Sequence, residues 1–180
     1  MFERQSRATL LRPPKGKMSI EAVRSFLKKW DKQDDILEFD VSSATVALAA
    51  EALGVEPARI AKTLAFKLGD SAVLIVAAGD AKVDNRKFKE QFETKAKMLT
   101  PEEALSFTGH AVGGICPFAV KDPTVKIYTD VSLRRFDTVY PACGSSNSAI
   151  RLSCAELFEI ADSQGWIDVC KDWEQEEHSI

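Results

Sequence analysis

The stretch EPARIAKTLAFKL, residues 56–68, decides the fold of this chain because it predicts a short helical turn that runs directly into a strand. Pro57 suits a first helical position, where the amide hydrogen that proline lacks would have no partner anyway. From Ala61 onward, the side chains of a strand alternate between its two faces. One face then carries Lys62, Leu64, Phe66 and Leu68, and the other carries Thr63, Ala65 and Lys67.

Lys62 is the unusual residue of this strand, because the alternation places it on the apolar face at the strand's entry end. An ammonium group among leucine and phenylalanine side chains is unfavourable unless an anion or a hydrogen-bond acceptor meets it. Two interpretations remain open at this point. The side chain extends to solvent past the strand end, which is the more frequent case for a lone lysine, or it is held for a ligand.

Composition limits the classes of protein that this chain can represent. Its 180 residues suit one domain, and a hydrophobic content of 45% is enough for a core. The formal net charge of -3 gives no global basic field, so any contact with RNA has to be a local patch. The longest apolar run, residues 72–78, is too short to span a bilayer, and no signal peptide opens the chain. We therefore expect a cytoplasmic protein that does not bind membranes.

Cysteine and histidine are too sparse or too scattered to indicate a metal centre. The four cysteines show no CxxC pairing, and we expect them to be reduced thiols. With only two histidines in the chain, a zinc site is disfavoured. We expect neither a metal nor a cofactor.

Three segments are expected along the chain. Residues 1–17 are basic, contain Pro13-Pro14 and lack periodicity, so they predict a flexible arm. The arm is either a tether for RNA or, more commonly for such a segment, an unstructured tail. Residues 18–173 form the expected domain, and residues 174–180 form an acidic tail that should fray.

Capping and turn signals locate the elements of the domain. Predicted helices begin at Ser19, at Thr45 with Gly54 at its end, after Asp84, at the capping box Thr100–Glu103, and at the capping box Ser153–Glu156. Predicted strands cover residues 37–41, 61–68, 72–78, 95–99, 125–128, 138–142 and 149–152. The second and third of these flank a Gly69-Asp70 turn and should pair as a hairpin. Helices and strands intermix without a regular βαβ rhythm, which predicts a single α+β domain with a mixed, curled sheet flanked by helices.

Two polar loops are candidate sites besides Lys62. In the loop 109–117, Gly113-Gly114 permits unusual backbone angles and Pro117 stiffens the exit. Such a loop can direct several N–H groups at an oxyanion or a phosphate, although Gly-Gly before Pro also makes ordinary turns. The run 143–148 offers hydroxyl and N–H groups for a ribose or an amino group; taken alone, an ordinary hairpin loop is the favoured interpretation.

Other nucleophilic schemes are weaker. Cys116 and His110 would make a thiol–imidazole pair, but most cysteines are small buried hydrophobic residues. Ser145 lacks the Gly-x-Ser-x-Gly context of a hydrolase elbow. Neither a P-loop nor a dinucleotide fingerprint is present.

Five segments in order resemble one known family. They are TVALAAEALG (45–54), IAKTLAF (60–66), Gly79-Asp80 with Asp84, VGGICPF (112–118) and GSSNSAI (144–150). Together they are similar to the YbaK/ProX family of aminoacyl-tRNA deacylases, which is related to the editing domain inserted in bacterial prolyl-tRNA synthetases. The resemblance extends from about residue 36 to residue 165.

The resemblance implies a barrel-like mixed sheet and hydrolysis of the ester between a wrong amino acid and the 3′-terminal adenosine of tRNA. The implied partners are aminoacyl-tRNA and an aminoacyl-tRNA synthetase. Lys62 matches the family's functional lysine, and Gly113 and Gly114 lie in its GxxxP loop, so these three are the candidate catalytic residues. The candidate substrate-binding residues are Thr45, Thr63, Asp80, His110, Ile115, Cys116, Pro117, Gly144, Ser145, Ser146 and Asn147.

One departure from the family pattern matters. Many members have a histidine just before the helix that begins here near Thr45, whereas this chain has Ser42-Ser43. An aminoacyl ester is already activated, so a positioned water or the substrate's own functional group could attack it while backbone N–H groups stabilise the oxyanion. Two rival functions remain open: a non-catalytic RNA-binding module, and a thiol enzyme built on Cys116.

Overall fold

The computed structural model describes residues 15–173, with side chains from residue 19 onward. Its helices are α1 (Lys15–Leu27), α2 (Val46–Leu53), α3 (Asn85–Phe92), α4 (Pro101–Thr108) and α5 (Cys154–Ile160). Helix α1 begins at Lys15, inside the segment predicted to be an arm; the rest of that arm and the acidic tail lie outside the described residues. Within residues 15–173, no helix combines the length and the apolar character needed to cross a membrane.

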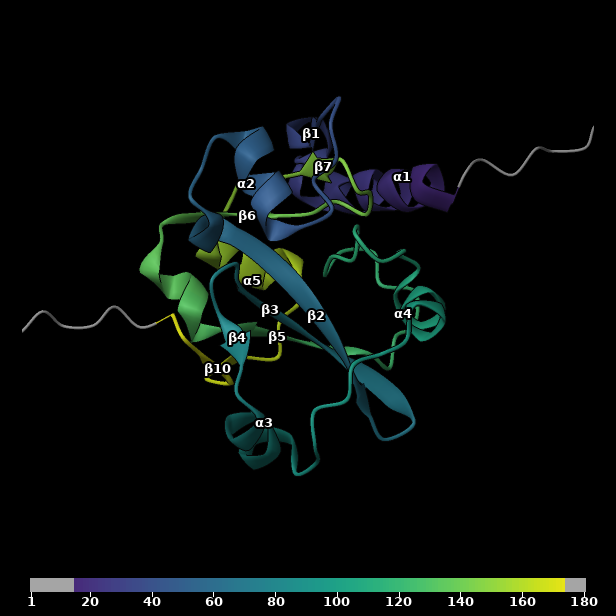
Figure 1. Ribbon diagram of the computed structural model, residues 1–180. Helices are drawn as coiled ribbons and strands as arrows, with labels where there is room; N and C mark the ends of the chain where they lie inside the picture. Colours follow the sequence, from purple (N-terminus) through teal and green to yellow (C-terminus); the bar gives the residue numbers. More distant parts are fainter. Residues whose placement is uncertain (1–14, 174–180) are drawn as a thin grey trace, which may run out of the picture.

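A six-stranded mixed sheet forms the centre of the domain (Figure 1). Its order is β8 (Leu152–Ser153), β6 (Thr138–Pro141), β2 (Ile60–Leu68), β3 (Ser71–Ala78), β5 (Lys126–Asp130) and β9 (Trp166–Ile167). The pairs β2–β3 and β6–β8 are antiparallel, and the pairs β2–β6, β3–β5 and β5–β9 are parallel. The prediction of a mixed, curled α+β sheet in a single domain is confirmed.

Two short ladders complete the strands of residues 15–173. Strand β1 (Leu37–Glu38) pairs with β7 (Ser148–Ala149), and β4 (Lys82–Val83) pairs with β10 (Cys170–Lys171). The first ladder holds the segment before α2 against the 143–148 loop. It therefore helps to position one wall of the site described below.

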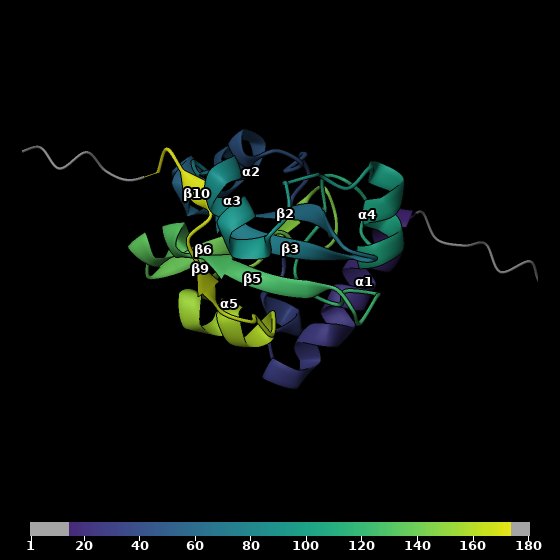
Figure 2. The same cartoon turned by 90° about the horizontal axis from the view of Figure 1, so that it is seen from below.

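Strands β2 and β3 pair as the hairpin that the sequence predicts, and they lie in the middle of the sheet. Lys62 lies opposite Ala77 and Thr63 opposite Val76. Strand β3 is buried from Ala72 to Ala78, because α1 and α5 cover one face of the sheet while α2 and α3 lie on the other (Figure 2). The core gathers side chains from all these layers, including Val23, Leu27, Phe88, Leu157 and Ile160.

Four of the five predicted helix starts are confirmed, and the exception is Ser19, which lies inside α1. Thr45 accepts a hydrogen bond from the amide of Leu48, and both predicted capping boxes form, at Thr100 and at Ser153. Gly54 and Gly109 end α2 and α4 with φ angles of 68° and 78°. Each residue acts through its own backbone neighbours, which is why sequence alone locates these ends.

Several predicted elements are shorter than the sequence indicates, and the strand expected at 149–152 is divided between β7 and β8. The strand expected at 37–41 pairs only at Leu37–Glu38, because its partner β7 is two residues long, and Val41 is 61% exposed. The strand expected at 95–99 is reduced to a single bridge between Phe66 and Met98. Helix α5 ends at Ile160, well before Gly165, because Asp162 adopts a left-handed φ of 52°.

Candidate functional site

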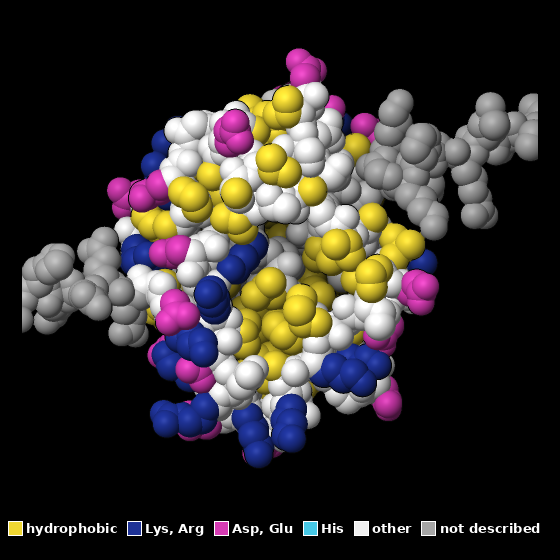
Figure 3. Space-filling view, viewed as in Figure 1, with side chains coloured by type: hydrophobic (Ala, Val, Ile, Leu, Met, Phe, Trp, Pro, Cys, Tyr) yellow, Lys and Arg dark blue, Asp and Glu magenta, His cyan; other side chains and the backbone are white. Residues whose placement is uncertain are grey.

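A cavity of about 230 Å³ opens beside β2 (Figure 3). Its walls come from β2, the start of α2, the loop after α4 and the strands β6 and β7. Hydrophobic side chains gather in the hollow at the centre of the face drawn in Figure 3. The lining is largely apolar and contains several small residues, among them Ala49, Ala61, Ala65, Ala104, Ala142 and Ala149.

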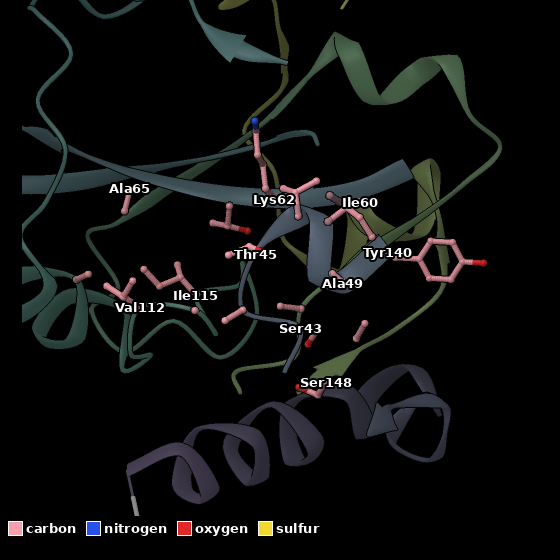
Figure 4. Close-up of a pocket in the computed structure, with 18 of the residues that line it drawn as sticks. Ser43, Thr45, Ala49, Ile60, Lys62, Ala65, Val112, Ile115, Tyr140 and Ser148 are labelled. Atoms are coloured by element: carbon pink, nitrogen blue, oxygen red, sulfur yellow. The ribbon is translucent and has the colours of Figure 1, made fainter. Parts of the chain in front are cut away.

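Four hydroxyl side chains of Ser and Thr line this cavity (Figure 4). Two of them are already engaged: Thr45 Oγ1 caps α2 at 3.2 Å from the amide of Leu48, and Ser148 Oγ lies 2.6 Å from Ser145 Oγ. The other two, Ser43 Oγ and Thr63 Oγ1, are buried and have no hydrogen-bond partner among the described residues. Ser43 and Thr63 thus line a largely apolar wall, and their hydroxyl oxygens are buried behind its surface.

Lys62 borders the cavity, but its side chain leaves β2 on the side away from Ser43 and Thr45 (Figure 4). Its Nζ donates to the carbonyl of Gly79 at 3.2 Å and to the carbonyl of Ala81. Burial lowers the pKa of this half-buried ammonium. The acceptor that the sequence requires is therefore supplied by the β3–β4 turn, and one of the three N–H groups of the ammonium remains for a ligand.

The two glycine-containing loops pack backbone against backbone. A Cβ on Gly114 would lie 2.8 Å from the Gly144 carbonyl carbon and 2.8 Å from the Ser145 nitrogen, so only glycine fits there. Gly113 and Gly144 have φ angles of 95° and 90°, in the left-handed region. These glycines therefore bring the loop 110–118 against the loop 143–148 and shape one end of the cavity.

Amide directions in the first loop differ from the sequence-based expectation in one respect. The N–H of Gly114 donates to the carbonyl of Ala111 at 3.0 Å, so this donor is already used inside the loop. Gly113 and Ile115 line the cavity, and their amides donate no hydrogen bond among the described residues. The amides of Gly113 and Ile115, which flank Gly114, are thus among the loop donors that remain for an oxyanion.

His110 belongs to the core, not to the cavity wall. It is 1% exposed, its Nε2 lies 2.7 Å from the carbonyl of Phe118, and its Nδ1 contacts Ser19 Oγ. Burial lowers the pKa of the imidazole, which favours a neutral ring that donates from Nε2 and accepts at Nδ1. The histidine thus fastens the glycine loop to α1.

Cys116 is also buried behind the loop. Its Sγ lies 3.5 Å from His110 Nε2, and burial raises the pKa of the thiol to about 12. Because the thiolate is the reactive form, a thiol that stays protonated at neutral pH is a poor nucleophile. This geometry gives the thiol-enzyme alternative no support.

The remaining candidates support the fold around the cavity. Asp80 accepts from Arg135 Nη1 and Nη2 at 3.0 and 2.6 Å. Ser145 Oγ donates to Asn147 Oδ1 at 2.9 Å, and Asn147 Nδ2 donates to the carbonyl of Phe39 at 3.0 Å. The structure therefore brings five candidates to the cavity and leaves the others outside its lining; the five are Thr45, Lys62, Thr63, Gly113 and Ile115.

Sequence reasoning missed several lining residues. Ser43 entered it only as a departure from the family pattern, and Ser148 only as the last residue of a polar run. Tyr140 and Met98 carried no signal at all, because a strand tyrosine and a methionine in a connecting segment are equally compatible with ordinary packing. Only the folded arrangement places these residues on the cavity.

Comparison with known proteins assigns the chain to a family. Residues 41–160 match the model of the aminoacyl-tRNA editing domain. YwhH, an uncharacterized protein of Bacillus subtilis, is 55% identical over 159 residues, covering 87% of this chain and 100% of its own. The proline–tRNA ligase of Thermotoga maritima is 35% identical over 91 residues, covering 50% of this chain and 15% of the ligase.

Structural comparison agrees with the sequence matches. A crystal structure described as a candidate trans-editing enzyme for prolyl-tRNA synthetase superposes with a TM-score of 0.77 and 27% identity, covering 89% of this chain and 99% of the other. The region that matches the family model spans two thirds of the chain and contains every residue lining the cavity. The chain belongs to the aminoacyl-tRNA editing domain family.

Proposed function

We propose that this protein is a trans-editing hydrolase that cleaves the ester bond of mischarged aminoacyl-tRNA, with the 3′ acceptor end seated at the cavity. The observation that carries the proposal is the coincidence of the family match with the apolar cavity. At about 230 Å³ the cavity exceeds the ~150 Å³ engineered cavity that holds a benzene molecule, so it has room for an aminoacyl group.

The chemistry follows from the groups at the cavity. An aminoacyl ester is activated, so a water molecule or the substrate's own functional group attacks its carbonyl without a strong protein nucleophile. The amides of Gly113 and Ile115 stabilise the oxyanion that develops, because hydrogen-bond donors fixed in place need no reorganisation during the reaction. This assignment replaces the amide of Gly114, whose hydrogen is already bonded within its loop.

Lys62 acts at the edge of the cavity in this proposal. Its ammonium lies on the far side of β2 from Ser43, held by two carbonyls, so the remaining N–H suits a phosphate or ribose oxygen of the terminal nucleotide. A charge-assisted contact of this kind is stronger than a neutral one. Lys62 then orients the ester over the Gly113–Ile115 loop.

The partners follow from the same reasoning. Proline–tRNA ligases contain a similar segment as a small part of a much longer chain, which favours an activity that supplements that of a synthetase. We infer that it acts in the cytoplasm on aminoacyl-tRNA of the tRNA(Pro) type or a related one. The net charge of -3 favours modest affinity for tRNA by itself, and hence capture of released tRNA or help from the synthetase.

The test is a panel of mischarged tRNAs incubated with the full-length protein, with loss of the ester followed against the rate without protein. We expect accelerated hydrolysis of at least one aminoacyl-tRNA. A mobility shift of the charged tRNA with the ester intact would instead identify a binding module. Absence of hydrolysis above the background across the panel would overturn the proposal.

A further inference from the structure

The turn between β3 and β4 holds the ammonium of Lys62, so the position of this turn decides where the ammonium lies. The carbonyls of Gly79 and Ala81 both accept from Lys62 Nζ, the first at 3.2 Å. Asp80 lies between these two residues in the chain. Because the backbone has only two soft dihedral angles per residue, the angles at Asp80 and Ala81 set the directions of both carbonyls. A group that fixes Asp80 therefore also aims the ammonium.

Arg135 fixes Asp80 from a distant segment of the chain. It ends the short 3₁₀ helix Val131–Arg135, and its Nη1 and Nη2 donate to the two carboxylate oxygens of Asp80 at 3.0 and 2.6 Å. Two such bonds fix the orientation of a carboxylate as well as its distance. The same 3₁₀ helix holds the end of β3, because Ser132 Oγ accepts from the amide of Ala78 at 3.1 Å.

Arg135 is itself held in one position. Its side chain is 19% exposed, and its guanidinium lies over the rings of Phe136 and Trp173, at 5.0 and 5.2 Å from their centroids. Nε donates to the carbonyl of Ser132 and Nη1 to that of Trp173, each at 2.9 Å. Four of the five N–H groups of the guanidinium are thus paired. A side chain locked by its own contacts can hold a neighbouring group in place.

We propose that Arg135 is a positioning residue for Lys62, and that it keeps the β3–β4 turn where its carbonyls direct the remaining N–H of the ammonium toward the substrate. This inference rests on the proposed function. Arg135 also occupies the carboxylate of Asp80, which is close enough to influence Lys62: burial lowers the pKa of the ammonium, and the negative charge of Asp80 opposes that shift. Without Arg135, this carboxylate would compete with a phosphate or ribose oxygen for the same N–H.

The experiment is a double-mutant cycle on the deacylation of one mischarged tRNA that the full-length wild type cleaves. Its variants are Arg135→Met, Lys62→Met and the combination of the two, measured in single turnovers well below each melting temperature. Methionine keeps the aliphatic stem of the arginine and removes the guanidinium. Arg135→Met should slow deacylation by roughly 10- to 100-fold, the effect of displacing a reacting group by about 1 Å. In the Lys62→Met background it should slow the reaction less than about twofold, because the group that it positions is gone.

Arg134→Met is the matched control. Arg134 precedes Arg135 in the same 3₁₀ helix, but it is exposed and lies over Trp166 of β9, 5.3 Å from the ring centroid. This variant should keep the wild-type rate. Arg135→Lys keeps the charge without the planar fork and should restore part of the rate. It replaces Arg135→Met in the cycle if a thermal melt shows that the methionine variant is unfolded.

A second measurement does not depend on turnover. The NMR signal of the Lys62 ammonium, assigned by its loss in Lys62→Met, should shift in Arg135→Met and stay in place in Arg134→Met. A merely structural role for Arg135 would lower the melting temperature and leave this signal unchanged, which would overturn the proposal.

The kinetic outcomes are equally distinct. Equal slowing by Arg135→Met in both backgrounds would overturn the positioning role, since the effect would not pass through Lys62. An unchanged rate in a folded Arg135→Met protein would also overturn it and would leave the proposed hydrolase intact. If the wild type cleaves no mischarged tRNA, the proposed function itself fails, and the positioning role fails with it.

Discussion

Replacing Lys62 by methionine, which keeps most of the aliphatic stem and removes the charge, is the sharpest test of the site. The side chain makes two charge-assisted hydrogen bonds, to the carbonyls of Gly79 and Ala81. Hydrogen bonds to charged groups contribute about 1.5–3 kcal/mol each. Burial opposes this gain, since it lowers the pKa of the ammonium by disfavouring the charged form. We therefore expect a net loss of about 1–3 kcal/mol in the free energy of unfolding.

That loss corresponds to a lower melting temperature by about 2–4 °C for each kcal/mol in a chain of this size. The expectation differs from the one that follows from sequence alone, in which a cation held for a ligand has no partner in the free protein and its removal costs no stability. The structure supplies carbonyl partners, so Lys62→Met should weaken both the fold and the reaction. Deacylation should fall by roughly 10- to 150-fold if one charged contact to the substrate is lost.

The assay pairs a thermal melt with the deacylation rate, measured well below the melting temperature of each variant. Lys67→Met is the matched control on the same strand: its ammonium pairs with Glu103 at 2.9 Å on the surface, where removal should change little. Lys62→Arg should restore only part of the rate, because a planar guanidinium replaces a compact ammonium. Full activity in a well-folded Lys62→Met protein would refute the catalytic assignment, and an unchanged melt would refute the structural one.

Three further predictions test the loop 110–118. Gly114→Ala should lower stability by about 1–3 kcal/mol, since its Cβ would meet the backbone of Gly144 and Ser145 at 2.8 Å; Gly165→Ala, with open space around the new methyl group, is the control for the melt. In the wild type, burial lowers the folded-state pKa of His110 below 6.5, so the unfolded state binds an extra proton below that pH. The free energy of unfolding then falls as the pH falls from 6.5 to 5, by at most about 1.4 kcal/mol per pH unit. His110→Gln removes this titration and should flatten that pH dependence. An unchanged slope in denaturant titrations would contradict the buried neutral ring. Cys116→Ala should keep its deacylation rate, and alkylating reagents should not inhibit the wild type, because the thiol is buried and its pKa is raised to about 12; rapid inactivation would revive the thiol mechanism.

The sequence predicts those parts of the fold whose causes are local. Thr45, Thr100 and Ser153 cap helices through their own neighbours, and the Gly69-Asp70 turn joins two strands that alternate or run apolar. Elements that depend on a distant partner are predicted less well. The strand expected at residues 37–41 can extend only as far as β7 does, and nothing between residues 37 and 41 encodes the length of β7.

In the candidate site, too, residues placed by local causes are predictable from the sequence and residues placed by distant contacts are not. Thr63 and Lys62 are predictable as neighbours on opposite faces of one strand, whereas Ser43 and Tyr140 join the cavity only because distant segments converge on β2. Gly114 was a candidate for its amide, but the structure gives it a packing role that depends on the loop 143–148. A sequence pattern indicates which functional groups a segment contains. It does not indicate which of these groups are already engaged in contacts with another segment of the fold.

The alternation of β2 also separates two functions that a single catalytic residue would combine. Thr63 lies on the face of β2 that lines the cavity, where the proposed function seats the aminoacyl group, while Lys62 leaves the opposite face and meets the β3–β4 turn. A contact with the nucleotide is common to all aminoacyl esters, so Lys62 variants should slow every substrate by the same factor. A contact with the side chain differs between substrates, so Thr63 variants should change their ratio. Adjacent strand residues cannot exchange faces without a shift in register. The backbone of β2 therefore keeps the residue that sets the rate and the residue that sets the selectivity on opposite faces of the strand.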